Sequence, residues 1–355
     1  MDQSLHSFLA QLRAATTPEE VFGPLPGDQP AALKQRYRAL VAQFHPDLHP
    51  KHPAEAHEAF KTLQHWYAAA QAKVDNGVYG TTPRITVSGT HHQYVGYEPP
   101  LTGDLCDLFP ANADGERVLL KVARQPRNND LLQQEARLVQ RIARELDGKP
   151  VRAHFPTLIE PFVLRDATNV DRHINVLRAE PETYSLAEVV NAYPQGLHPA
   201  DAAWMFRRLI AALGIVHGMG FVHGAVILPH VLIRPSDHNG ILIDWCYSVA
   251  IDQPIKALSS PYKDDYPPEV PARQPAGPAT DLYMAARVLL HLLGGKTGTK
   301  DLPPSVPKPI RTLLDACLIP TPQRRVDDAW QLFDDFQDIL HALYGPPKFR
   351  PFKLN

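Results

Sequence analysis

A cluster of glycine and proline residues between positions 75 and 100 divides this chain into two parts with different hydrophobic patterns. Before the cluster, apolar residues recur at the three- and four-residue spacing of amphipathic helices. After it come short strand-like runs and then longer helical patterns. Glycine and proline interrupt regular structure, so a dense cluster of them marks a boundary. The sequence therefore predicts an all-α part followed by a part that contains a sheet, which is the α+β fold class.

The pattern predicts five segments along the chain. They are an amphipathic helix over residues 1–16, a helical hairpin module over 17–76, a linker over 77–92, a large domain over 93–343 and a basic tail over 344–355. The large domain is expected to be β-rich up to about residue 180, with one helix near 129–146. From 186 it is expected to be mainly helical, with strand-like runs at 231–235 and 241–245. The tail carries three positive charges and is expected to be flexible.

The composition restricts where such a chain works and what it binds. Its 36 Lys and Arg residues nearly balance 38 Asp and Glu residues, which argues against nucleic-acid and membrane partners because the chain as a whole has no attracting field. Three distant cysteines indicate neither a disulfide framework nor a zinc site and favour the cytoplasm. No leader-like start or apolar run of membrane-spanning length is present. The seventeen histidines lack metal-ligand spacing and are expected at the surface or in turns.

Apolar residues in the first part fall on one side of each predicted helix. The stripes are Leu5, Phe8, Leu9 and Leu12 near the N-terminus, Leu33, Tyr37, Leu40, Val41 and Phe44 in a helix over 31–44, and Phe60, Leu63, Tyr67, Ala70 and Val74 in a helix over 54–74. Thr17, Pro18 and Glu20 supply a capping hydroxyl, a first-turn proline and an acid typical of a helix start. The two longer stripes predict a pair of antiparallel helices.

The turn between these two helices contains the tripeptide His45-Pro46-Asp47. Pro46 stiffens the turn and restricts His45 to extended geometry, so that His45 and Asp47 should project from a rigid corner. The preceding helix also carries three cations with no acid between them, Lys34, Arg36 and Arg38. Such a stripe can steer an acidic partner towards the corner.

Residues 17–75 resemble the J-domain family of co-chaperones in this whole frame: the opening EEVFGPL, the basic helix LKQRYRALVAQF, the HPD turn and the following helix. The resemblance implies docking on a DnaK-type heat-shock chaperone and stimulation of its ATP hydrolysis. His45, Pro46 and Asp47 would be the trigger, with Lys34, Arg36 and Arg38 in support. Alternatively, the tripeptide is an ordinary proline turn and the cations form a solvated helix face. The chain departs from the family after Val74, where the common basic fourth helix is absent.

The larger part resembles the protein-kinase fold. The segment VLLKVAR places Lys121 in a strand-like run and Glu135 on the next helix, as in the lysine and glutamate pair of that family. GIVHGMGFVHGAVILPHVLIRP and GILIDWCYSV then resemble the catalytic loop and the metal-binding loop, with Asp244 matching the metal-binding aspartate. The resemblance covers about 250 residues and implies a small β-rich lobe and a large helical lobe.

Several positions depart from the kinase pattern. Ala225 replaces the aspartate that accepts the substrate proton, Ile227 replaces a lysine that contacts the transferring phosphate, and His230 replaces an asparagine that holds magnesium. The phosphate-covering loop, residues 101–109, keeps only Gly103 of the family glycines. Loss of a general base typically lowers the rate by about 10²- to 10⁴-fold. The sequence therefore predicts a pseudokinase.

Other kinase-like residues are expected to serve the fold. The resemblance implies an ion pair between Glu269 and Arg325, and hydrogen bonds from the backbone around His223 to Asp281. Lys121, Glu135, Asp244 and Gly103 remain as an expected weak site for ATP with one Mg²⁺ at Asp244, although the first two also suit a pair that only aligns the small lobe. No cofactor is required.

The leading hypothesis is a non-enzymatic, cytoplasmic J-domain co-chaperone that uses its pseudokinase domain to bind a client or a complex. The alternative is an unconventional ATP-dependent phosphotransferase that uses Lys121 and Asp244 with a displaced base. A third hypothesis is a scaffold whose helical hairpin has lost its chaperone. The sequence names no client.

Overall fold

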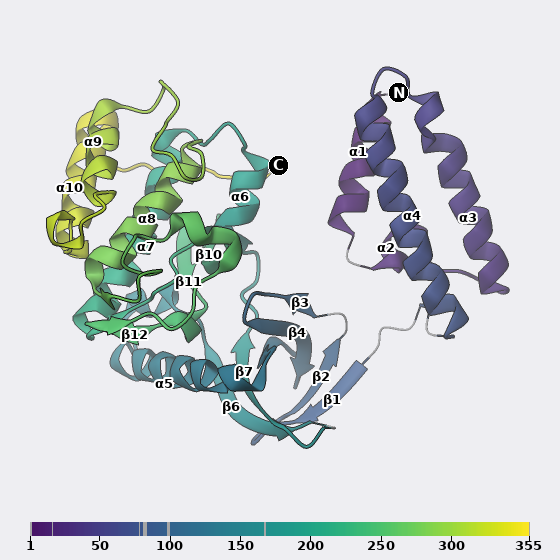
Figure 1. Ribbon diagram of the computed structural model, residues 1–355, viewed down its shortest axis with the longest axis horizontal. Helices are drawn as coiled ribbons and strands as arrows, with labels where there is room; N and C mark the ends of the chain where they lie inside the picture. Colours follow the sequence, from purple (N-terminus) through teal and green to yellow (C-terminus); the bar gives the residue numbers. More distant parts are fainter. Residues whose placement is uncertain are drawn as a thin grey trace. The chain divides into compact units, whose positions relative to one another are not determined.

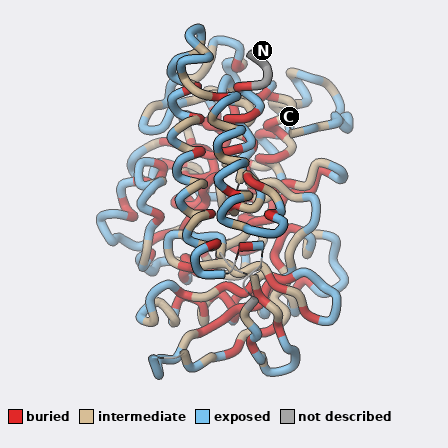
Figure 2. The backbone as a smooth tube through the Cα atoms, turned by 90° about the vertical axis from the view of Figure 1, so that its right-hand side faces the viewer, coloured by how far each residue is buried: buried red, intermediate tan, exposed pale blue. Residues whose placement is uncertain are grey.

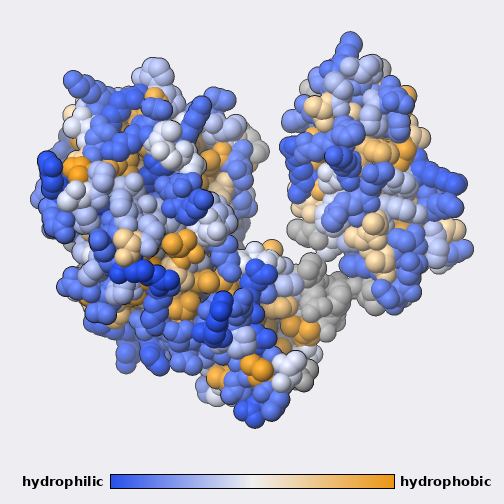
Figure 3. All heavy atoms as spheres, in the orientation of Figure 1, coloured by the Kyte–Doolittle hydropathy of each residue, from blue (hydrophilic) through white to orange (hydrophobic). Residues whose placement is uncertain are grey.

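The computed structural model describes residues 2–15, 17–77, 79–80, 84–97, 100–166 and 168–354. The chain forms two compact units, Met1–Ile85 and Thr86–Asn355 (Figure 1). Hydrophilic residues predominate on the face of each unit shown in Figure 3, with scattered apolar patches. Within the described residues, no helix combines the length and the apolar character needed to cross a membrane.

The first unit consists of helices. They are α1 (Asp2–Ala14), α2 (Pro18–Phe22), α3 (Gln29–Phe44) and α4 (Pro53–Asp75), with a 3₁₀ turn over Pro46–Leu48 between α3 and α4. The side chain of Asp28 caps α3 by accepting a hydrogen bond from the Ala31 amide at 3.3 Å. Thr17 stands at the start of α2, but its hydroxyl caps none of the described residues, so that part of the helix-start prediction is wrong.

The core of the first unit lies where α1, α3 and α4 meet. Figure 2 shows buried and exposed positions alternating along these helices, as amphipathic helices require. The predicted stripe of α1 is confirmed, since Leu5, Phe8, Leu9 and Leu12 are all buried. In the α3 stripe, only Leu33 and Phe44 are buried, and the residues between them pack at the edge of the core. Phe8 stacks on Phe44 with ring centroids 3.9 Å apart, which joins α1 to the end of α3.

The small lobe of the second unit is an antiparallel sheet. Within the described residues it has seven strands, with β3 paired to β4 beside the order β1-β2-β4-β5-β7-β6. The strands are β1 (Arg84–Ser88), β2 (Gln93–Tyr97), β3 (Leu101–Thr102), β4 (Cys106–Ala113), β5 (Glu116–Ala123), β6 (Leu158–Arg165) and β7 (Asp171–Arg178). Because β1 is a strand of this sheet, the predicted linker over 77–92 is in part sheet. The predicted helix near 129–146 is α5 (Asn129–Glu145), which packs on β7.

The large lobe is mainly helical. Its helices are α6 (Leu186–Ala192), α7 (Pro199–Gly218), α8 (Pro278–Leu292), α9 (Lys308–Cys317) and α10 (Ala329–Tyr344). Its short strands are β8 (Tyr184–Ser185), β9 (Phe221–Val222), β10 (Val231–Arg234), β11 (Asn239–Leu242), β12 (Val249–Ala250), β13 (Gln253–Pro254) and β14 (Pro275–Ala276). The strand-like runs predicted at 231–235 and 241–245 are β10 and β11, paired antiparallel. The second run ends early, because Asp244 has a left-handed backbone with φ 67°.

The C-terminal tail packs against the large lobe, so the prediction of a flexible tail is wrong. The Arg350 guanidinium lies 2.6 Å from Asp201, and the Arg350 carbonyl oxygen lies 2.8 Å from His238 Nε2. The Phe349 ring stacks on the His238 ring at 4.2 Å, and the Phe352 ring lies 5.7 Å from that of Tyr193. These aromatic and ionic contacts, which involve residues far apart in the sequence, hold the segment in place.

Several histidines occupy the interior, which corrects their expected placement at the surface or in turns. The buried ones are His154, His173, His223, His230, His238 and His291. Most of them have a polar partner within hydrogen-bond distance. His154 Nδ1 lies 2.9 Å from the Gly240 carbonyl oxygen, and His291 Nε2 lies 2.9 Å from Asp265 Oδ1. A buried imidazole with such a partner is compatible with a core position.

Candidate functional site

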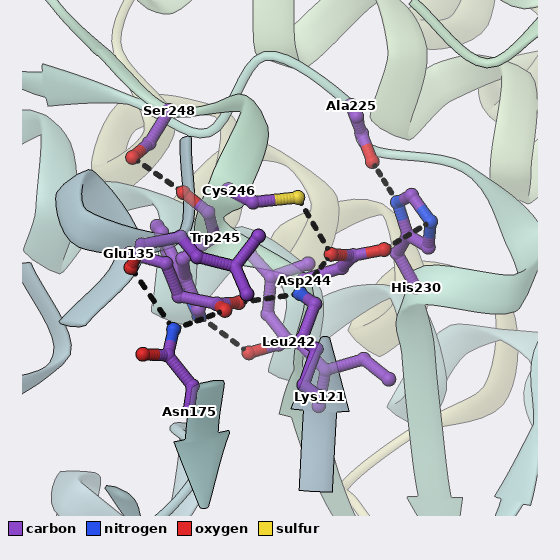
Figure 4. Close-up of polar contacts among 12 residues, drawn as sticks. Lys121, Glu135, Asn175, Ala225, His230, Leu242, Asp244, Trp245, Cys246 and Ser248 are labelled. Carbon is purple, nitrogen blue, oxygen red and sulfur yellow. Dashed lines mark hydrogen bonds and ion pairs between the residues drawn. The ribbon is translucent and has the colours of Figure 1, made fainter. Parts of the chain in front are cut away.

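A buried lysine forms the centre of the kinase-like site. Lys121 on β5 places its Nζ 2.7 Å from Glu135 Oε1 on α5 (Figure 4). The other carboxylate oxygen of Glu135 accepts a hydrogen bond from Asn175 Nδ2 on β7 at 2.9 Å. All three side chains are buried. The pair predicted from the sequence is therefore present, and Asn175 is a third member that sequence reasoning missed. A polar residue within the apolar run HINVL of a strand was the available signal.

Asp244 joins this pair from the opposite side of the site. Its Oδ1 contacts Lys121 Nζ and accepts a hydrogen bond from the Cys246 thiol at 2.9 Å, while its Oδ2 lies 3.0 Å from His230 Nε2 (Figure 4). Burial raises the pKa of Asp244, but Lys121 and His230 outweigh it and hold the pKa well below its usual range. Burial likewise lowers the pKa of Lys121, yet the surrounding negative charge, Asp244 foremost, raises it well above the usual value. Both groups are therefore ionised.

His230 is bound on both sides of its ring. Nδ1 lies 2.9 Å from the Ala225 carbonyl oxygen, and Nε2 faces Asp244. Both partners are acceptors, so both contacts are hydrogen bonds only when the imidazole carries both protons. His230 thus presents a ring nitrogen, in place of an amide oxygen, at the position where the kinase family has a metal-binding asparagine.

The residues present do not fit a magnesium ion. Mg²⁺ prefers an octahedron of oxygen ligands. Both oxygens of Asp244 are already occupied by Lys121, Cys246 and His230. Among the residues that the structure describes, no group of three or more His, Cys, Asp or Glu side chains is arranged to hold a metal. The sequence prediction of a weak metal site at Asp244 therefore lacks the ligands that it needs.

The loop after α7 has the backbone support expected of a catalytic loop but lacks a base at its centre. Asp281 accepts hydrogen bonds from the amides of His223 at 2.7 Å and Gly224 at 2.9 Å, and it lies 3.0 Å from His217 Nε2. The predicted support by Asp281 is confirmed, whereas His217 was missed. Ala225 is fully buried, and its amide donates to His223 Nδ1 at 3.2 Å. Ile227 is also buried, and its hydrocarbon side chain has no charge to present to a phosphate.

The loop that would cover a nucleotide is attached to the large lobe. Gly103 forms the turn between β3 and β4, where its amide donates to the Cys106 carbonyl at 2.9 Å. A Cβ at Gly103 would lie 2.8 Å from that carbonyl oxygen, so the turn requires glycine. The neighbouring Asp104 accepts a hydrogen bond from the buried Ser259 hydroxyl. Sequence reasoning did not anticipate this contact across 155 positions.

The predicted ion pair of the large lobe is also confirmed. Arg325 Nη1 lies 2.7 Å from Glu269 Oε1, and the second guanidinium nitrogen lies 3.3 Å from Oε2. Both side chains are almost completely buried. Arg325 also donates to the Ala279 carbonyl at 3.0 Å, so the guanidinium ties the start of α8 to the segment before α10.

The HPD corner of the first unit is partly exposed. The His45 side chain is 40% exposed and that of Asp47 is 88% exposed. His45 Nδ1 accepts a hydrogen bond from the Asp47 amide at 3.3 Å, and its ring lies edge-on to Phe60 of α4 at 5.4 Å. Pro46 begins the 3₁₀ turn that fixes the backbone between them. The Asp47 carboxylate lies 3.4 Å from His45 Nδ1 but remains exposed, so the corner is held by contacts that leave it accessible to a partner.

The three predicted cations of α3 have different environments. Lys34 and Arg38 are exposed, as a steering stripe requires. Arg36 is half-buried, and its guanidinium donates to the Phe22 carbonyl at the end of α2. A Cβ at Gly23 would lie 2.7 Å from that guanidinium. The structure thus gives Arg36 a role within the first unit, which corrects its expected place on the free stripe.

Comparison with known proteins supports a kinase-like second unit. No family model matches the sequence. The chain is 26% identical over 234 residues to serine/threonine-protein kinase F of Synechocystis sp. (strain ATCC 27184 / PCC 6803 / Kazusa). The match is longer than the whole first unit, Met1–Ile85, so it extends into the second unit. It covers 61% of this chain and 45% of the relative, so the chain spans less than half the length of that kinase.

This distant similarity and the two-lobed arrangement of sheet and helices fit a kinase-like domain. The comparison contains nothing on a J-domain, and the similarity to a kinase leaves catalytic activity open. The co-chaperone, pseudokinase and non-enzyme assignments therefore stay predictions.

His223 gives this site a pH-dependent contribution to stability. Burial lowers its pKa to about 4, from an ordinary value of about 6.5. Below pH 6.5 the unfolded chain takes up a proton that the folded chain excludes. The contribution is therefore complete above pH 6.5, decreases between pH 6.5 and 4, and is lost below about pH 4. We expect this group to lower the free energy of unfolding by about 3 kcal/mol over that interval. Urea denaturation followed by tryptophan fluorescence should show a smaller acid loss in His223→Gln. An equal loss in both proteins would contradict the assignment.

Proposed function

We propose that this protein is a co-chaperone whose first unit stimulates the ATPase of a DnaK-type chaperone. The observation that carries the proposal is the HPD corner, in which Asp47 is exposed and His45 is fixed against Phe60. The exposed Lys34 and Arg38 supply positive charge on the preceding helix. A rigid corner beside a cationic helix suits an acidic partner, because little order has to be gained on binding and the charges guide the approach.

The second unit, in this proposal, binds a client or a complex and transfers no phosphate. Two features support this role. Ala225 stands where the kinase family has its base, and both carboxylate oxygens of Asp244 already have partners, Lys121 and His230. A carboxylate whose two oxygens already contact a buried lysine and a histidine has to give up those partners before it can bind a metal. The cytoplasmic location and the chaperone partner belong to the same proposal.

The test is a steady-state ATPase assay of a DnaK-type chaperone with and without the full chain. The proposal predicts an increased rate of hydrolysis. An unchanged rate would leave the third hypothesis, a scaffold without a chaperone, as the better account of the helical hairpin.

A second candidate is an unconventional protein kinase or phosphotransferase that uses Lys121 and Asp244. The comparison with known proteins favours this candidate over the co-chaperone, because the matched relative is a serine/threonine-protein kinase. The retained contact of Lys121 with Glu135 also fits it. To act in this way, Asp244 would have to exchange its present partners for a metal-bound nucleotide, and another group would have to replace the missing base.

Radiolabelled ATP decides between the two roles of the second unit. We expect the full chain to transfer label at the background rate, and Lys121→Ala to leave that rate unchanged, because removal of the base alone costs about 10²- to 10⁴-fold. Lys149→Ala, at an exposed lysine of the same unit, serves as the matched control. Label transfer that survives in the control but disappears in Lys121→Ala would establish the phosphotransferase.

A further inference from the structure

The large lobe contains a cavity of about 770 Å³ outside the kinase-like site. One wall is formed by α7 and another by α10, and the docked tail closes the third side. The volume falls within the range of about 300 to 1,000 Å³ that is usual for small-molecule sites. Neither proposed function uses this cavity.

Its apolar walls suit a flat ligand. Trp204 stacks on His238 with ring centroids 4.2 Å apart and an interplanar angle of 5°. Phe349 of the tail also stacks on His238, again with ring centroids 4.2 Å apart. Leu340 and Tyr344 of α10 also line the space. Stacked aromatic walls favour a ligand with an aromatic or planar apolar body.

Two nitrogen atoms of α7 lack the partners that buried donors normally have. Trp204 Nε1 and Arg207 Nε are buried, and neither has a hydrogen-bond partner among the described residues. The two residues are three positions apart and therefore lie on the same face of the helix, and both line the cavity. Buried polar groups are nearly always paired, so two unpaired donors in one wall indicate an acceptor that this wall is built to receive.

The charge of the wall indicates the nature of that acceptor. The described contacts of Arg207 are neutral: one guanidinium nitrogen donates to Gln337 Oε1 at 2.6 Å, and the guanidinium lies over the Phe333 ring at 4.7 Å. Burial lowers the pKa of Arg207, and the nearby Arg208 lowers it further. The tail adds two more lining cations, Lys348 and the Arg350 that pairs with Asp201, against one lining carboxylate, Asp338. An anionic ligand would supply the missing negative charge.

We infer that this cavity binds a small organic anion with a flat apolar body, whose acidic group accepts hydrogen bonds from Trp204 Nε1 and Arg207 Nε. The stacked rings enclose the body of the ligand. Both donor atoms are covered in the present arrangement, so the acidic group reaches them only after the side chains around them shift locally.

Fluorescence titration of the full chain with anilinonaphthalene sulfonate, a planar aromatic anion, tests the inference. We expect saturable binding of one probe per chain. The uncharged analogue phenylnaphthylamine should bind about tenfold more weakly or worse, because it cannot accept the charge-assisted hydrogen bond. Equal binding of the two probes, or no saturable binding of the anion, would overturn the inference.

Variants locate the site. Arg207→Gln and Trp204→Phe each remove one donor and should weaken binding of the sulfonate about tenfold while leaving binding of the neutral analogue unchanged. Arg141→Gln is the matched control, since Arg141 also donates to a side chain and lies over an aromatic ring, Phe221, yet does not line the cavity. An equal effect in the control would place the probe elsewhere. If circular dichroism shows that a variant is unfolded, the comparison of the two probes on the unaltered chain decides the outcome.

Discussion

Replacement of His45 by glutamine should abolish the stimulation of a DnaK-type chaperone's ATPase by the full chain. His45 contributes both to the hydrogen bond with the Asp47 amide and to the edge contact with Phe60, so the substitution changes the shape of the corner as well as its chemistry. A residue at the centre of a docking surface typically contributes about 2 kcal/mol or more, which is roughly 30-fold in affinity. The measurement is the rate of ATP hydrolysis as a function of co-chaperone concentration.

His57→Gln is the matched control for this experiment. The substitution is chemically the same, but His57 lies on α4, where it is exposed and outside the HPD turn. The control should stimulate as the unaltered chain does. If both variants stimulate normally, the HPD corner is an ordinary proline turn and the co-chaperone proposal fails.

Replacement of Glu269 by glutamine should strongly destabilise the second unit. The substitution keeps the shape of the side chain but leaves the buried Arg325 guanidinium without its counter-charge. Loss of one partner of a buried ion pair costs about 3 to 5 kcal/mol, because the remaining charge stays in a medium of low polarity. Urea denaturation measures this loss as a lower midpoint of the transition for the second unit.

The pair between Arg234 and Asp237 provides the contrast. Its nitrogen-to-oxygen distance is 2.9 Å, close to that of the buried pair, but the Asp237 side chain is 50% exposed. Asp237→Asn should therefore cost less than about 1 kcal/mol. A similar loss in the two variants would mean that burial of the Glu269 pair is not what gives it its importance.

The two predictions concern different units and separate the two halves of the proposal. His45→Gln removes a contact to a partner and should leave the urea transition of the second unit unchanged. Glu269→Gln should leave the HPD corner intact at low denaturant. Each unit has its own hydrophobic core. If one substitution changed both the chaperone stimulation and the urea transition of the second unit, the independence of the two units would be contradicted.

The elements of the fold followed from local patterns. The period of apolar residues predicted α1, α3, α4 and α5, and all four are present. These patterns are reliable because each amphipathic helix must bury one face, whatever its neighbour is. The β-like run expected at 84–87 is the strand β1, but the bounds of the linker were less well predicted, because this strand belongs to the sheet.

Part of the site was predictable for a similar reason. The contacts of Lys121 with Glu135, and of Asp281 with the loop at His223, follow from motifs whose spacing matches that of the kinase family. The partners of Asp244 did not follow from spacing. His230 reaches it from a separate loop, 14 positions earlier in the chain, and Asp244 itself has a left-handed backbone.

By itself, the sequence determined the order of helices and strands, the α+β class, the HPD turn and the absence of a carboxylate at Ala225, because each of these depends on residues close together in the chain. Only the tertiary structure decided how the charges are used. It paired Asp244 with Lys121 and His230, assigned Arg36 to the Phe22 carbonyl and fixed the tail on the large lobe. Such pairings depend on which distant groups packing brings within hydrogen-bond distance, and no local pattern of residues encodes that.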